Sequence, residues 1–423
     1  MSIKSGQILH DVNGFVIDRI QTAGPGNLNI PEEKVYELGN YKSVGTVRDI
    51  PDLSFDLESF DVSTEFEALL IGENPTTFPS TVGSNEIDFR NAVPIDVISP
   101  FKSRKNAYDI VKGVAVPYLT LERASYRFGL RQNASQQFSL KGDSIYYIPG
   151  TPYYKEFTNV GAGPYSFGNT AITYTEGSNS VHALCVVLVD STTKAYKRLF
   201  YVPSGDLATS DYSYTDTSST VTLSDDYSAD YDTVRIVWGS TTSVNYTQTG
   251  NNPSGNPVHE GTSGTKPIAV RAKDIDIYIG TTGATPVFTR LNSVQSFEAT
   301  WSVNLDNDEE FGNEHYVSQD YETAEVTGTV GVKPYDPADL WSKLAQITGV
   351  ASNEVVGPQI ATPVPLEARI YHPDTGSILK TIYIPDARFQ IPGYSGQVQQ
   401  KVETSLPFTS DGGLMYVYNG ARV

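Results

Sequence analysis

The chain has 423 residues and carries 49 Asp and Glu against 30 Lys and Arg, which gives a formal net charge of −19 at pH 7. A hydrophobic content of 39% and a charged content of 19% are typical of a folded, soluble protein of two or three domains. So acidic a surface repels polyanions, which argues against nucleic-acid binding through phosphate contacts and against docking on an anionic membrane.

The first part of the chain is predicted to consist of strands with one short helix. A long polar loop is expected over 22–47. A strand over 52–60 follows, because apolar and polar residues alternate there with a period of two. A helix is then predicted from a cap at Asp61 or Ser63 to a terminator at Gly72. Its apolar face would consist of Phe66, Leu69 and Leu70.

The middle of the chain has a different composition, and turn-rich runs rich in Gly, Pro and Ser flank it. Short apolar or β-branched stretches separated by Tyr-, Ser- and Thr-rich spacers predict a small β-sandwich. Its expected strands cover 183–189, 195–202, 219–223 and 232–238.

The last part of the chain is again predicted to be mainly strands. A strand over 275–279 opens it, a polar loop is expected over 292–318, and alternation predicts a strand over 323–332. Asp336 and Pro337 suit the start of a helix that would end at Gly349. The apolar side of that helix would carry Leu340, Trp341, Leu344 and Ile347.

The last part loosely repeats the first, which is the most informative feature of the sequence. Arg19 returns as Arg290, Gly39 as Gly312, Asp49 as Asp320 and Asp61 as Asp336, at offsets of 271 to 275 residues. Tyr126-Arg127-Phe128 returns as Ala387-Arg388-Phe389 at an offset of 261, and a glutamine-bearing strand follows each, over 134–138 and 398–402. Offsets that drift so little indicate two diverged copies of one unit. The predicted domains are therefore 1–157, 158–267 and 268–423.

A search for chemistry yields no catalytic or cofactor motif. The five histidines lack zinc-ligand spacing, and no phosphate-binding glycine loop or nucleophile elbow occurs. The single cysteine, Cys185, sits in an apolar strand and is interpreted as a buried structural thiol. Asp306–Glu310 begins like a calcium loop, but Phe311 replaces the required glycine, so a solvated loop is favoured. We expect no cofactor, no metal and no enzymatic activity.

One cysteine permits no intrachain disulfide, which fits assembly in a reducing compartment. The first residues show no apolar segment of a secretory signal. No apolar run approaches the roughly 18 residues that a membrane-spanning helix requires.

The doubled strand-and-helix unit resembles the major tail tube proteins of long-tailed, siphovirus-like prokaryotic viruses, most closely those with a duplicated tube domain. The matching features cover about 8–157 and 268–423: the Arg19 and Arg290 segments, the polar loops, the alternating strands, the two helices and the glutamine-bearing strands. The resemblance implies two tandem β-sandwich or barrel domains, each with one flanking helix, and an inserted β-sandwich that decorates the outside.

The resemblance further implies a ring of three chains that stacks into a non-contractile tube. It implies partners as well: further copies of the chain, a tape-measure protein, and tail-terminator and tip proteins, with DNA passing through without specific binding. The virion tail, assembled in the host cytoplasm, would be its location. The expected lumen residues are acidic or uncharged, so that DNA would not adhere: Asp52, Asp56, Glu58, Thr323, Glu325, Thr327, Ser135, Gln137, Gln397 and Gln399. The expected inter-ring contacts come from the polar loops: Asn27, Glu32, Glu33, Asp306, Asp308, Glu309 and Glu310.

A second reading remains open at this point. Tyr-rich stretches at 207–231 and 241–249 are compatible with a carbohydrate- or receptor-binding β protein of a virion tip, because aromatic rings stack on sugars. A polysaccharide-degrading enzyme would need paired carboxylates across a cleft, and the sequence nominates no pair.

Overall fold

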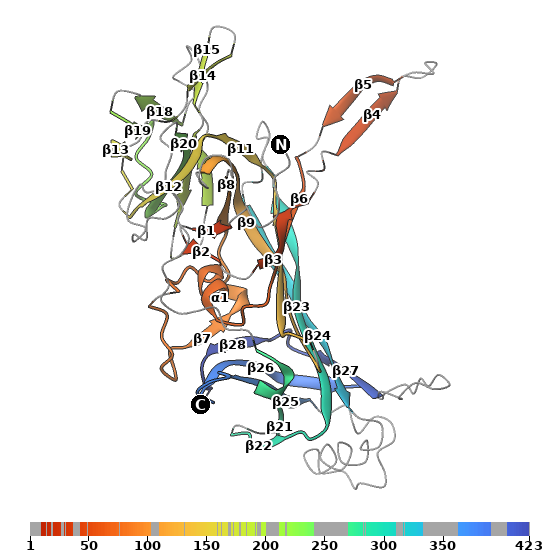
Figure 1. Ribbon diagram of the computed structural model, residues 1–423. Coiled ribbons are helices and arrows are strands. Elements are labelled where there is room, and N and C mark those ends of the chain that lie inside the picture. Colours follow the sequence, from red (N-terminus) through yellow and green to blue (C-terminus); the bar gives the residue numbers. More distant parts are fainter. Residues whose placement is uncertain are drawn as a thin grey trace.

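The computed structural model is mainly β, with one α-helix in the part of the chain that it describes (Figure 1). The described residues are 10–13, 15–17, 20–26, 29, 31–36, 43–48, 50–75, 77–102, 110–130, 132–158, 160–161, 163–167, 171, 173–176, 179–182, 184–190, 192, 196–199, 211–215, 218–240, 270–281, 283, 285–309, 316, 318–332, 363–390 and 404–422.

The first unit surrounds one long strand, β9 (Ile110–Gly129), which belongs to two groups of strands. The C-terminal half of β9 pairs with β10, β10 pairs with β6, and β6 pairs with β3. The N-terminal half pairs with β8 and β11, and β8 pairs with the β1–β2 hairpin. Between the halves, Tyr118 has a φ of 54°. The bounds are β1 Asp11–Val12, β2 Phe15–Val16, β3 Ile20–Pro25, β6 Leu53–Ser59, β8 Ile95–Lys102, β10 Ser135–Gly142 and β11 Tyr146–Pro149.

The second unit has the same pattern of pairings. Here β26 pairs with β27, β27 with β24, and β24 with β23. The strand β26 also pairs with β25 and β28, and β25 pairs with β21 of the β21–β22 hairpin. The bounds are β21 Ile275–Gly280, β22 Phe288–Arg290, β23 Val294–Asp308, β24 Ser318–Val332, β25 Val364–Tyr371, β26 Ile378–Phe389, β27 Thr404–Ser410 and β28 Tyr416–Asn419.

Seven antiparallel pairings of the first unit thus recur in the second, strand for strand and in the same order along the chain. The two units also join edge to edge, because β9 pairs with β23 over Arg123–Gly129 and Ser296–Ser302. One continuous series results: β3–β6–β10–β9–β23–β24–β27–β26. The buried apolar residues of both units form a single core cluster, in which Phe128 stacks on Phe297 with ring centroids 5.8 Å apart.

The single described helix, α1 (Glu65–Leu70), lies within the predicted range of the first-unit helix. Gly72 follows it with a φ of 77°, as expected of a terminator. The N-cap is Thr64 instead of Asp61 or Ser63. The carboxylate of Asp61 accepts a hydrogen bond from the Ser63 N–H just before the helix. The helix predicted from Asp336 lies outside the described residues.

The inserted segment forms two small sheets over a core of its own, as the sequence predicted. One sheet has the order β12–β20–β16–β17 and the other β13–β19–β18, and a β14–β15 hairpin accompanies them. Trp238, Tyr153 and Phe167 pack together between the two sheets. The bounds are β12 Thr151–Phe157, β13 Tyr165–Ser166, β14 Thr173–Glu176, β15 Asn179–His182, β16 Leu184–Val189, β17 Tyr196–Leu199, β18 Tyr212–Thr215, β19 Thr220–Leu223 and β20 Thr233–Ser240.

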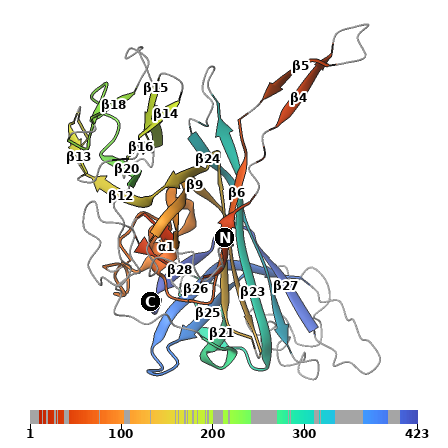
Figure 2. The ribbon, with the colours of Figure 1, turned by 45° about the horizontal axis from the view of Figure 1, so that its top comes forward.

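Two expectations need correction. The predicted loop over 292–318 is largely strand, because β23 continues to Asp308 and pairs with β24 down to Ser318. The predicted loop over 22–47 contains most of β3 and a hairpin, β4 (Glu32–Tyr36) with β5 (Ser43–Arg48), which projects from the body in both views (Figures 1 and 2). In β23 the buried alternation of Phe297, Ala299, Trp301 and Val303 was missed, and it ends at Val303, beyond which the strand continues with exposed and partly exposed residues. In addition, β12 pairs with β20 of the insert, although the sequence placed it in the first unit.

Candidate functional surfaces

A polar surface runs across all eight strands of the joined sheet, at right angles to the strands. Its central row is formed by residues that are paired one after another: Thr22, Glu58, Gln137, Ser125, Thr300, Thr327, Thr409 and Arg388. A parallel row contains Gly24, Asp56, Ser139, Arg123, Ser302 and Glu325. We call this surface the polar face. Because paired residues of a ladder point to the same side, the face crosses the seam between the two units without interruption.

The polar face brings together most of the predicted lumen residues. Asp56, Glu58, Ser135, Gln137, Glu325 and Thr327 all lie on it, and all are exposed or partly exposed. Asp52, just before β6, and Thr323, on β24, are also exposed. Each lies in phase with the polar residues of its strand. Gln397 and Gln399 lie outside the described residues. Whether this face lines a lumen stays a prediction.

The charge of the polar face differs from the expected acidic character. Arg123, Arg127, Lys141 and Arg388 stand among its carboxylates. Three of these cations are paired: Arg127 with Glu298 at 2.9 Å, Lys141 with Glu122 at 3.0 Å, and Arg388 with Asp411. The face is therefore mixed and rich in hydroxyl groups, and neighbouring acids neutralise most of its described bases.

The predicted inter-ring residues fall on two projecting hairpins instead of loops. Glu32 and Glu33 belong to β4, and Asp306 and Asp308 lie near the end of β23, with Glu309 directly after it. Asp306 pairs with Asp320 in the ladder, which excludes the calcium-loop geometry for this segment. Asn27 and Glu310 lie outside the described residues.

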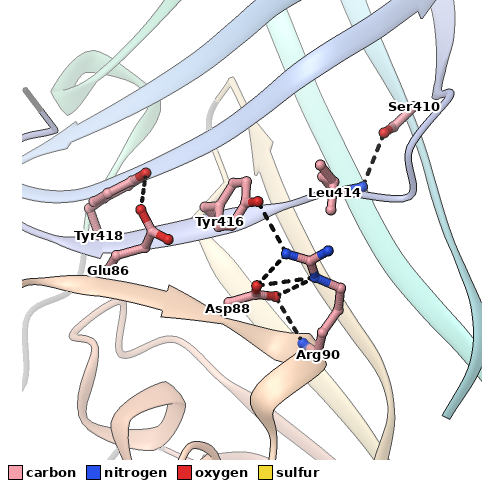
Figure 3. A network of polar contacts seen from close by, with 7 residues as sticks. All are labelled: Glu86, Asp88, Arg90, Ser410, Leu414, Tyr416 and Tyr418. Atoms are coloured by element: carbon pink, nitrogen blue, oxygen red, sulfur yellow. Dashed lines mark hydrogen bonds and ion pairs between the residues drawn. The ribbon is translucent and has the colours of Figure 1, made fainter.

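A second junction between the units is made by β7 (Glu86–Asp88), which pairs with β28 of the second unit. Figure 3 shows the polar contacts around it. Tyr418 donates to Glu86 at 2.6 Å, and Arg90, held by Asp88, donates to Tyr416 at 3.2 Å. The Leu414 N–H donates to Ser410 at 3.2 Å in the turn that precedes β28. Residues of η2 (Phe89–Asn91) continue the chain beyond β7.

A buried ion pair reinforces this junction. Lys380 of β26 and Glu67 of α1 are both fully buried, and Nζ lies 2.5 Å from Oε1. The same ammonium donates to Gln136 at 2.8 Å, and the Tyr126 hydroxyl donates to Glu67 at 2.9 Å. Burial lowers the pKa of Lys380 and raises that of Tyr126. Sequence reasoning missed this cluster, although a lysine in phase with Ile382 and Ile384 was its visible signal.

The insert attaches to the first unit through side chains of a shared apolar cluster. Ile98, Ala115 and Ile148 of the first unit pack against Cys185, Val187 and Val237 of the insert. Two insert arginines reach buried carboxylates beside this cluster: Arg198 to Asp143 at 3.0 Å and Arg235 to Asp96 at 3.5 Å. Cys185 is buried as predicted, and burial raises the pKa of its thiol to about 12.

Most of the described tyrosines of the insert pack against its own apolar core. Tyr212 is buried, Tyr214 stacks on Phe167, and Tyr227 and Tyr231 pack against the same core. Tyr227 also lies under the Lys197 ammonium, 4.7 Å from the ring centroid. Among the described residues, this region offers no row of free rings for stacking on a sugar. The stretch over 241–249 lies outside them.

Comparisons with known proteins give limited likeness. No family model matches the chain, and a search of curated proteins finds no match. A chain of the anti-feeding prophage (AFP) baseplate, solved by cryo-EM with 6-fold symmetrisation, is 9% identical; the match covers 34% of this chain and 91% of that chain, with a TM-score of 0.24. A chain of the tail of an empty GTA particle, solved with helical refinement in C6 symmetry, is 17% identical; here 34% and 96% are covered, with a TM-score of 0.21. Scores this low assign neither fold nor function. No helix in the described part of the chain is long and apolar enough to cross a membrane.

Proposed function

We propose that this chain is a structural subunit of a virion tail tube, in which three copies form a ring and rings stack into a hollow tube. The observation that carries the proposal is the recurrence of one strand arrangement in two units that already join edge to edge within the chain. A chain built in this way contains one finished seam of a ring.

The ends of the eight-strand series suggest how the ring continues. Within this series, the internal seam joins β9, the last of the four strands from the first unit, to β23, the first of the four strands from the second unit. The corresponding strands are β26 at the end of the second unit and β3 at the start of the first. In the described residues β3 pairs only with β6. An edge of this kind favours pairing with another chain, and closing a ring removes every edge.

The polar face would then line the bore. Hydroxyl and amide groups, with bases that neighbouring acids neutralise, give DNA phosphates few cations from which to displace counterions. DNA, with a tape-measure protein during assembly, would pass along this face without specific binding. The insert would face outward, because its junction lies on a different side of β9 from the seam.

The test is the mass and shape of the assembled particle. Purified chain, at 46.2 kDa per copy, should form three-chain rings or stacked tubes visible by negative-stain electron microscopy, with the matching mass in light scattering. A species that stays monomeric at high concentration and shows no ring in the microscope overturns the proposal.

A further inference from the structure

The β7–β28 junction shows how one unit completes the edge of the next. Ile87 pairs with Val417 at the centre of the junction, and both side chains are fully buried. Asn85, directly before β7, donates its side-chain amide to the carbonyls of Asn419 and Ala421 at 3.0 and 2.8 Å. The first unit therefore supplies a short strand to the second unit, anchored by a buried asparagine.

The first unit has an edge of the same construction in β11. Both β11 and β28 pair with the strand at the centre of their unit, β9 or β26. Tyr146 through Gly150 has the same layout as Tyr416 through Gly420, and both glycines have positive φ, 74° and 95°. In the described residues, β11 pairs with no other strand.

The edge strands β28 and β11 differ in how far their central side chains are exposed to solvent. Val417 pairs with Ile382 and is covered by Ile87, so none of its surface is accessible. The corresponding residue, Tyr147, pairs with the buried Val114 on the core side of β9, yet its side chain is 78% exposed. The Tyr147 ring thus lies uncovered at the position where Ile87 covers Val417 in the second unit.

The sequence contains a second segment whose residues resemble those of the covering strand. Asn85-Glu86-Ile87 comes after the first-unit helix and before Pro94-Ile95, which opens β8. Asn353-Glu354-Val355 comes after the second helix signal and before Pro363-Val364, which opens β25. This second segment lies outside the described residues.

We propose that β11 of one copy receives the segment 353–356 of a second copy, as β28 receives β7 within the chain. Val355 would cover Tyr147, and the Asn353 amide would donate to the carbonyls of Pro149 and Thr151. A second copy is the occupant because β25, where the chain resumes after this segment, and β11 lie at opposite ends of the molecule (Figure 1).

Two contacts of the internal junction cannot recur. Asn419 donates its N–H to the Asn85 carbonyl at 2.9 Å, whereas Pro149 in its place has no N–H. Tyr418 donates to Glu86, whereas Ile148 has no hydroxyl group. The junction between copies is therefore weaker than the one within the chain, which suits a subunit that folds alone and assembles afterwards.

The inference rests on the proposed ring, and cysteine cross-linking separates the two. In a Cys185→Ala background, Tyr147→Cys with Val355→Cys should form a disulfide between copies under mild oxidation. On a non-reducing gel this gives a dimer and then a closed trimer that resists further growth. The matched control, Ile87→Cys with Val417→Cys, should give only a monomer with altered mobility.

Each outcome has a definite meaning. Rings in the microscope combined with monomeric Tyr147→Cys/Val355→Cys chains overturn the inference and leave the ring standing. Equal cross-linking by Tyr147→Cys alone also overturns the inference. Unoxidised chains that form no ring overturn the ring and the inference together.

A proline pair gives a second, independent test. Val355→Pro removes an N–H and the extended pairing, so the concentration needed for half assembly should rise at least about tenfold while the melting temperature of the monomer stays unchanged. Ile87→Pro should instead lower the melting temperature of the monomer. Assembly by Val355→Pro at the wild-type concentration contradicts the inference.

Discussion

The two junctions that meet on β9 are built by different means. Toward the second unit, β9 uses its backbone: seven residue pairs with β23 form a regular ladder. Toward the insert, it uses side chains, with Ala115 and Tyr118 packing into a mixed apolar cluster beside buried arginines. The first junction has the construction of a sheet interior and the second that of a domain interface.

The two kinds of junction restrict the amino-acid sequence in different ways. A backbone ladder constrains register but few side chains, because a slip of one residue would turn the polar face toward the core. A side-chain interface constrains particular residues and leaves the rest of the insert unrestricted. We therefore expect perturbations of the unit junction to act on the whole fold, and perturbations of the insert junction to act locally.

The largest effect is expected at Lys380. Lys380→Ala leaves Glu67 as an unpaired buried charge, which should lower the free energy of unfolding by about 3 to 5 kcal/mol in chemical denaturation. The control is Lys112→Ala, because Lys112 faces Pro149 as Lys380 faces Asn419 but is exposed. A second control, Lys380→Met with Glu67→Gln, should recover much of the loss. Equal effects of the two alanine variants would refute the assignment.

Arg198 tests the junction between the first unit and the insert. Arg198→Ala removes the cation that pairs with the buried Asp143 carboxylate, which still accepts a hydrogen bond from the Tyr316 N–H, and should cost about 3 kcal/mol, mostly in the insert and its contact with the first unit. Hydrogen exchange should speed up in β16, β17 and β20 while β23 and β24 stay protected. The neighbouring Lys197→Ala is the control. Faster exchange across both units would show that the junctions are not separable.

His10 probes the first unit away from both junctions. It is buried, its Nδ1 lies 3.0 Å from the Ser99 hydroxyl, and burial lowers its pKa from 6.5 to about 4. The unfolded chain therefore binds the proton more tightly, so the contribution to stability is complete above pH 6.5 and is lost as the pH falls toward 4. Between about pH 8 and pH 5 the loss should reach about 2 kcal/mol. His10→Asn should flatten this part of the stability profile; an unchanged profile would contradict the assignment.

The smallest effect is expected on the polar face. The Arg127–Glu298 pair crosses the seam at 2.9 Å, but the two side chains are 63% and 39% exposed. Arg127→Ala should therefore cost about 0.5 kcal/mol, less at high salt. Glu298→Ala should match it in thermal unfolding. A loss comparable to that of Lys380→Ala would mean that side chains, and not the backbone ladder, hold the seam.

Much of the fold could be predicted from periodicity. Leu53, Phe55 and Leu57 are buried as their alternation indicated, and the four predicted strands of the insert correspond to β16, β17, β19 and β20. The far end of β23 was missed, because Asp306 and Asp308 are exposed and no buried residue alternates with them there. The second helix and Gln397 lie outside the described residues, so those predictions stand as they were.

The surfaces were less accessible to sequence reasoning. Alternation found Asp56 and Glu58 on the polar face but could not reveal which strands would become neighbours. Arg127 contacts Glu298 only because the two units join at the seam. Lys380 contacts Glu67 although more than 300 residues separate them in the sequence. Such contacts depend on strand order, which one sequence does not determine.

The continuity of β9 has a mechanical consequence. One covalent strand of 20 residues contacts the insert in its N-terminal half, continues past Tyr118 with its positive φ, and enters the seam with β23. A force on the insert is thus transmitted along a single backbone to the seam between the two units. Any load that acts on the insert would therefore act directly on the joint between the two halves.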